Sequence, residues 1–183
     1  MSSTGAQETP PSADDFDLLP VERPADPATL ARQADVTRRL GVRRTMLELH
    51  QLGGFLTLAG LTLTVTFGQI NYLDKYAGGG DSGRFYKAHQ FTAIGTAVIF
   101  GATGLLALFA PSPTDKPLRL DTSTLHKLAM SIATAGMLAQ IILGPFTASK
   151  EGTTAQRNYA LAHQIIGYTT LVATAAGFTV LTF

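Results

Sequence analysis

The sequence contains no cysteine among its 183 residues, and this absence excludes several kinds of site. Disulfides, iron–sulfur clusters and thiolate zinc sites all require cysteine. The Cys-x-x-Cys-His motif that attaches a c-type haem requires it too. Any metal or cofactor in this protein is therefore held by other side chains, without a covalent bond to sulfur.

Charged residues are also scarce. They make up 15% of the chain, against about a quarter in a typical soluble domain, while 45% of the residues are hydrophobic. The charges gather before residue 50 and around the short stretches that separate long apolar runs. This distribution indicates a membrane protein. The formal net charge of +1 gives no indication of a nucleic-acid partner.

Four apolar runs dominate the remainder, and none contains aspartate or glutamate beyond its first turn. They lie at roughly 47–70, 86–110, 123–147 and 158–182. Each is long enough for the ~20 residues that cross the hydrocarbon core of a bilayer. Short polar connections between long helices favour antiparallel neighbours. The sequence therefore predicts an all-α membrane protein, with a four-transmembrane-helix antiparallel up-down bundle in a domain of residues 46–183.

Residues 1–45 have a different composition and form a separate region. The first part is rich in proline and acidic residues and lacks the apolar residues of a folded core, which predicts disorder. Residues 27–44 could form a short helix capped by Asp26, with Pro27 at its first position. No cleavable signal is expected, because the tail has no apolar segment.

Basic residues predict the orientation in the membrane. A cluster of four arginines at residues 38–44, just before the first run, and three basic residues around the second connection make seven on one side, whereas five lie around the first and third connections. The positive-inside rule then places both termini in the cytoplasm. We expect an integral protein of a bacterial inner membrane that contacts lipid.

The chain has only four histidines, one at the start of each apolar run: His50, His89, His126 and His163. Runs one and three share Leu-His-x-Leu, and runs two and four share Ala-His-Gln, so the two halves resemble copies of one hairpin. In an antiparallel bundle the starts of alternate helices lie at the same face of the membrane. His50 is thus expected at the depth of His126, and His89 at the depth of His163.

Small residues continue along the histidine-bearing face of each run, and on the third run this face includes Ala129, Ala133, Gly136, Gln140 and Gly144. Such a face leaves room for a flat cofactor, although it is also typical of plain helix packing. The histidines could likewise serve only to hydrogen-bond neighbouring helices. Burying an ionisable side chain in a membrane costs free energy, however, which favours a functional role for all four. Haem is the favoured ligand because two imidazoles satisfy its axial positions. Zinc fits poorly because no carboxylate or thiolate joins the histidines to complete its coordination shell. Bacteriochlorophyll, which needs one histidine per pigment, is an open alternative.

This ladder of histidines, spaced 39, 37 and 37 residues apart, resembles the cytochrome b561 family of transmembrane dihaem b cytochromes. The resemblance covers about residues 46–183. It implies two haem b groups, one held by His50 and His126 and the other by His89 and His163. It further implies transmembrane electron transfer, with a quinol or a redox partner subunit as donor.

Two further expectations concern the surroundings of such haems. Lys87, Lys127 and Arg84 lie near helix starts and are candidates for pairing with the propionates, because anionic carboxylates favour cations. Snorkelling to lipid headgroups would explain the same positions. We expect an electron carrier or oxidoreductase subunit without a soluble catalytic domain. The alternative is a haem- or pigment-binding anchor or accessory subunit of a larger respiratory or photosynthetic complex.

Overall fold

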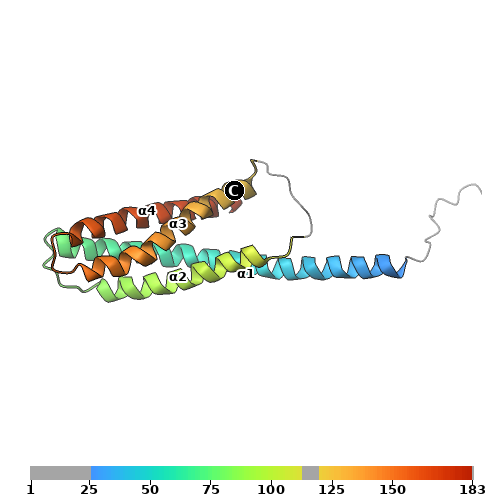
Figure 1. Cartoon of the computed structure of the whole chain (residues 1–183), viewed down its shortest axis with the longest axis horizontal. Coiled ribbons are helices and arrows are strands. Elements are labelled where there is room, and N and C mark those ends of the chain that lie inside the picture. The colour runs from blue at the N-terminus through green and yellow to red at the C-terminus, as the bar shows by residue number, and fades with distance from the viewer. Residues whose placement is uncertain (1–25, 113–119, 183) are drawn as a thin grey trace, which may run out of the picture. The chain divides into compact units, whose positions relative to one another are not determined.

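The computed structural model describes residues 26–112 and 120–182, and these residues form four long helices (Figure 1). The helices are α1 (Pro27–Tyr76), α2 (Tyr86–Phe109), α3 (Thr122–Ser149) and α4 (Gln156–Thr182). The chain divides into two units, residues 1–37 and 38–183. The first contributes the start of α1 to the described residues, and the second holds the remainder of α1 and the other three helices. Disorder was predicted for the first part of the tail. Residues 1–25 of it lie outside the described part of the chain.

Helix α1 is one continuous helix, where the sequence had suggested a short helix over 27–44 followed by a separate apolar run from residue 47. The residues at the supposed boundary favour helix and include no proline. An ion pair between Arg44 and Glu48, 2.9 Å apart and one turn from each other, also stabilises this stretch. The start of α1 agrees with the predicted cap: Asp26 precedes Pro27, and its side-chain Oδ1 accepts a hydrogen bond from the amide of Ala28 at 3.4 Å.

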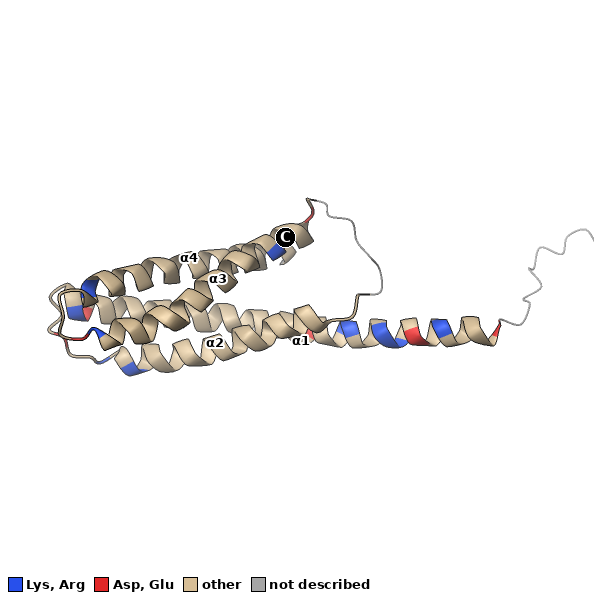
Figure 2. Cartoon of the chain, in the orientation of Figure 1, with Lys and Arg blue, Asp and Glu red and all other residues tan. Residues whose placement is uncertain are grey.

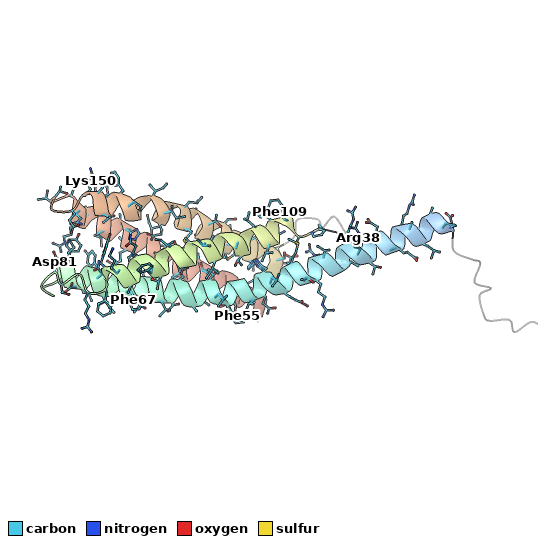
Figure 3. All side chains as sticks on the ribbon, turned by 90° about the horizontal axis from the view of Figure 1, so that it is seen from below. Arg38, Phe55, Phe67, Asp81, Phe109 and Lys150 are labelled. Carbon is cyan, nitrogen blue, oxygen red and sulfur yellow. The ribbon has the colours of Figure 1, made fainter. Side chains whose placement is uncertain are left out.

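All four helices are long and apolar enough to cross a membrane, which indicates an integral membrane protein. No lysine, arginine, aspartate or glutamate occurs in residues 49–73, 88–109, 128–149 or 158–182, and the charges of residues 38–183 flank these stretches (Figure 2). Large apolar side chains project outward along the helices, among them Phe55 and Phe109 (Figure 3). An outer surface of this kind suits contact with lipid tails.

The interior is built from small and hydroxyl-bearing side chains rather than large apolar ones. Its buried members are Thr57, Leu61, Thr64, Thr96, Thr103, Ala133, Met137, Thr170, Ala173 and Thr174. Several threonine hydroxyls donate to the carbonyl one turn earlier, as Thr64 does to Gly60 and Thr170 to Ile166, at 2.8 and 2.7 Å. These bonds satisfy polar groups that would be costly in hydrocarbon.

Helix α1 contacts α2, and α3 packs along α4, through matching residues. A Cβ atom on Gly60 would meet the side chain of Thr96, and one on Gly136 would meet Thr170. Residues 60 and 136 are 76 apart, and residues 96 and 170 are 74 apart. These are the same offsets that separate the two pairs of histidines. The internal repeat seen in the sequence therefore extends to the contacts between helices.

Polar and aromatic contacts join the two hairpins. The amide of Gln164 donates to the side-chain oxygen of Gln69, which also accepts from the hydroxyl of Tyr168 at 2.7 Å. Toward the other end of the same helices, the rings of Phe55 and Phe178 meet edge to face with centroids 4.8 Å apart. Helices α1 and α4 are thus in contact at two levels.

Candidate functional site

The structure brings the four histidines together in the two pairs expected from their order along the chain. The ring centroids of His50 and His126 lie 6.1 Å apart, with the ring planes at 83°. Those of His89 and His163 lie 5.9 Å apart, with the planes at 89°. Each pair joins one helix of the first hairpin to one of the second. The role of these residues as ligands stays a prediction.

Three of the four imidazoles are held by a main-chain carbonyl of the neighbouring helix. Nδ1 of His50 lies 2.8 Å from the carbonyl oxygen of Thr103, and Nδ1 of His126 lies 2.8 Å from that of Gly177. Nδ1 of His89 lies 2.9 Å from the carbonyl oxygen of Thr64. A carbonyl oxygen only accepts, so Nδ1 carries the proton in each ring.

This tautomer leaves the lone pair on Nε2, the ring nitrogen turned away from the carbonyl. Histidines that ligate metals almost always donate their other N–H to a carbonyl or carboxylate in this way. The bond fixes the orientation of the ring and raises its basicity as a ligand. In three of the histidines Nε2 is therefore the nitrogen with a free lone pair, and the ring is oriented by its bond to the carbonyl.

The fourth ring, that of His163, is held differently. Its Nδ1 is buried and has no hydrogen-bond partner among the described residues. The side-chain amide of Gln140 instead donates to the main-chain carbonyl of His163, at 2.6 Å. Gln140 was visible in the sequence only as one member of a face of small residues, and nothing there singled it out.

Glycines make room for the rings of the second pair. A Cβ atom on Gly68 would lie 2.9 Å from Cε1 of His89, closer than real Cβ contacts come. The corresponding atom on Gly144 would lie 3.6 Å from Cε1 of His163, an ordinary contact. The two glycines occupy equivalent places in the repeat, but only Gly68 is required for the observed ring position.

A cavity of about 1090 Å³ surrounds the pair of His89 and His163. Its inner end is lined by Leu61 and Met137, and its other end reaches Lys87 near the start of α2. Ligand pockets in proteins typically measure about 300–1,000 Å³, so this space is large enough for a cofactor. The cavity is lined mainly by small or apolar residues, as expected for a flat, largely apolar molecule.

Lysine 75 is the charged residue that the sequence reasoning missed. It lines this cavity, is one-fifth exposed, and bridges Asp81 and Glu151 at 3.2 and 3.0 Å. These bonds join the connection after α1 to the connection after α3. Its position seven residues after Gly68, on the same side of α1, was the signal that could have found it.

The three cations predicted to pair with propionates lie in different settings. Lys87 is exposed, lines the cavity and lies 5.9 Å from the ring centre of Tyr86. Arg84 lies 5.5 Å from the ring centre of Phe85 and does not line the cavity. Lys127 is exposed, next to His126. Lys87 is thus the predicted cation with direct access to the space around the second pair.

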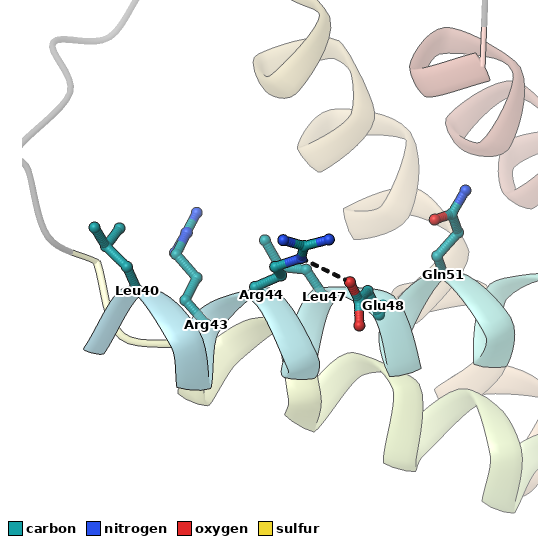
Figure 4. A pocket seen from close by; sticks show the side chains of 6 residues that line it. All are labelled: Leu40, Arg43, Arg44, Leu47, Glu48 and Gln51. Carbon is teal, nitrogen blue, oxygen red and sulfur yellow. Dashed lines mark hydrogen bonds and ion pairs between the residues drawn. The ribbon is translucent and has the colours of Figure 1, made fainter. Parts of the chain in front are cut away.

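A shallow hollow of about 390 Å³ lies along one side of α1, in the stretch of the helix that leads up to His50 (Figure 4). It is lined by Leu40, Arg43, Arg44, Leu47, Glu48 and Gln51. Arg43 also donates to the carbonyl of Pro111 at 3.0 Å, which ties α1 to the residue just beyond α2.

Within residues 26–112 and 120–182, no three histidine, aspartate or glutamate side chains come together as a metal-binding group. Among these residues the imidazoles of the four histidines come together as the two pairs. None of the protein-family models, curated proteins or solved structures compared with the chain matches it.

Proposed function

We propose that this protein is a transmembrane dihaem b-type cytochrome that resembles the cytochrome b561 family. In this proposal His50 and His126 hold one haem iron, and His89 and His163 hold the other. The observation that carries the proposal is the pairing of imidazoles about 6 Å apart, three of them with Nδ1 bound to a carbonyl.

The spacing of the rings supports a metal between them. A bond of about 2 Å from each imidazole nitrogen to the metal, plus the radii of two five-membered rings, gives centroids about 6 Å apart. The centroids observed are 6.1 and 5.9 Å apart. Around the second pair the cavity of about 1090 Å³ supplies the space for the macrocycle.

Haem held by two imidazoles would supply a one-electron couple and would have no open coordination position for oxygen or a substrate. Electron transfer is therefore favoured over chemistry at the metal. Thr103 and His89 are fourteen residues apart in α2, and His163 and Gly177 are fourteen apart in α4. At 1.5 Å per residue the two pairs lie about 21 Å apart along the helices. The four helices thus hold two redox sites at two depths.

We further propose that the four helices form an antiparallel up-down bundle in a bacterial inner membrane, with both termini in the cytoplasm. The contacts between α1 and α2 support this arrangement, because His50 meets Thr103 and the later residue Thr64 meets the earlier residue His89. The donor would be a quinol or a redox partner subunit, and the apolar surface would contact lipid.

The proposal is tested by purifying the full chain in detergent and recording reduced-minus-oxidised spectra with a pyridine haemochrome assay. We expect two haem b groups per chain. Protein without haem would overturn the proposal. A magnesium tetrapyrrole would favour a pigment-binding role, and stable copurification of redox-inert haem with a large complex would favour an anchor subunit.

A matched pair of glycine variants probes the second site. Gly68→Ala places a Cβ atom 2.9 Å from Cε1 of His89, so the ring must move away from its carbonyl partner. We expect one haem of the two to bind more weakly, by about 10- to 100-fold, as for other changes to groups that orient metal ligands. Haem content after dialysis against a haem-binding apoprotein measures this.

Gly144→Ala is the control, because its Cβ atom would make an ordinary contact with His163 at 3.6 Å. It should retain both haems with near wild-type affinity. Equal losses in the two variants would contradict the role assigned to Gly68.

A further inference from the structure

The two hairpins differ at one position that bears on a predicted ligand. In the first hairpin Nδ1 of His89 lies 2.9 Å from the main-chain oxygen of Thr64. The offset of 76 residues that relates α1 to α3 makes Gln140 the counterpart of Thr64. The main-chain bond has no counterpart there, since Nδ1 of His163 has no partner among the described residues.

Two buried polar atoms without partners belong to this one contact: Nδ1 of His163 and Oε1 of Gln140. The other atom of the same amide, Nε2, already donates to the carbonyl of His163 at 2.6 Å. The amide is therefore seated against the main chain of His163, and one acceptor of Gln140 and one ring nitrogen of His163 are left without partners. Buried polar atoms are nearly always paired, so such a coincidence calls for a specific explanation.

Glycine 167 shows that the space for this amide is built into the fold. A Cβ atom on Gly167 would lie 2.9 Å from Nε2 of Gln140. Any larger residue at position 167 would push the amide away from His163. The glutamine and the glycine thus form a local feature of the second hairpin.

We propose that Gln140 is the positioning residue of His163. On rotation of the terminal amide, its side-chain oxygen provides the acceptor that a main-chain carbonyl provides for the other three imidazoles. The torsion that turns an amide is broad, so this rotation needs no change of rotamer in the rest of the chain. The inference rests on the proposed dihaem function.

The consequence is that the two haem sites are unequal. An acceptor on Nδ1 makes the imidazole a more basic ligand, which favours the oxidised iron. For three of the proposed ligands the acceptor is a main-chain carbonyl, so it does not depend on which side chain the accepting residue carries. At His163 it is a side chain, so the potential of one haem depends on the identity of residue 140.

The test is redox titration of the full chain, followed optically, with two variants at position 140. Gln140→Met keeps the length of the side chain and removes the acceptor. We expect the midpoint potential of one haem to rise by about 59 mV, equivalent to a tenfold change in the relative affinity for oxidised and reduced haem. The other potential should not change. The affected haem is identified as the one absent from His89→Ala protein.

Gln140→Thr is the rescue variant, because it restores the residue of the first hairpin and opens the main-chain carbonyl of residue 140 to Nδ1. Its shift should be less than half that of Gln140→Met. Thr64→Val is the matched control in α1, since it alters the side chain and leaves the main-chain acceptor of His89. Its shift should also be less than half that of Gln140→Met.

The outcomes separate this inference from the proposed function. A wild-type chain without haem overturns both, before any variant is made. Two haems in the wild type, with potentials that Gln140→Met leaves unchanged or shifts equally, overturn the role of Gln140 alone. Loss of one haem from Gln140→Met with retention in Gln140→Thr supports the role, and loss from both variants overturns it.

Discussion

Replacing His89 by alanine should reduce the haem content from two groups per chain to one, and replacing His163 should remove the same group. The two imidazoles lie 5.9 Å apart and would share one iron, so neither alone satisfies both axial positions. Pyridine haemochrome assays and redox titration of each purified variant measure the loss. This is the largest effect expected from a single substitution in the chain.

Double variants make the pairing itself testable. His89→Ala with His163→Ala should retain one haem, because both changes affect the same site. His89→Ala with His126→Ala should retain none, because one ligand is missing from each site. Imidazole added to the buffer should partly restore the missing haem in the single variants, since alanine leaves space for it. Equal haem content in the two double variants would contradict the pairing.

The second large effect is expected at the contact between α3 and α4. In Gly136→Ala the new Cβ atom would collide with Oγ1 of Thr170, a fully buried residue whose hydroxyl donates to Ile166 at 2.7 Å. Thr170 cannot give way without breaking that bond or moving the helices apart. We expect a loss of about 1–3 kcal/mol in stability, the usual range for overpacking a core. Thermal unfolding in detergent, followed by circular dichroism, measures it.

Two further variants control for this effect. Gly101→Ala adds the same methyl group to α2, where nothing lies within 4 Å, so its stability should be equal to or above that of the wild type. Thr170→Ala removes the atom that the new methyl group would meet. Combined with Gly136→Ala, it should recover part of the lost stability. A Gly136→Ala protein as stable as Gly101→Ala would show that the helices do not pack through this contact.

The helices and the histidine pairs were predictable for simple physical reasons. Apolar runs of membrane-spanning length can hardly be anything except helices. In alternating helices the residues near alternate starts share one level, which brings His50 to His126. The continuous α1 was missed because the change in composition near residue 45 looked like a structural boundary. A change from polar to apolar residues shows that the surroundings of a helix change from water to lipid. It does not end the helix, which requires a helix-breaking residue such as proline.

The groups that hold the histidines were beyond the sequence. Three of them are main-chain carbonyls, and every residue carries one, so residue type says nothing about which carbonyl faces a ring. The choice of Thr64 or Gly177 depends on the rotation of each helix, and packing decides that. The place of Lys75 on α1 could be read from the helical period, but its ion pairs could not. Its partners Asp81 and Glu151 lie in two different connections, and sequence order does not show that these meet.

Each helix of the first hairpin carries a histidine of one pair and, fourteen residues away, the carbonyl that holds a histidine of the other. Helix α4 does the same with His163 and Gly177. The distance between the two levels is therefore set inside single helices, by the rise of the α-helix. A thicker or thinner bilayer can tilt the protein or move its connections, but it cannot stretch this distance. The gap that an electron would cross is the same in any membrane the protein occupies.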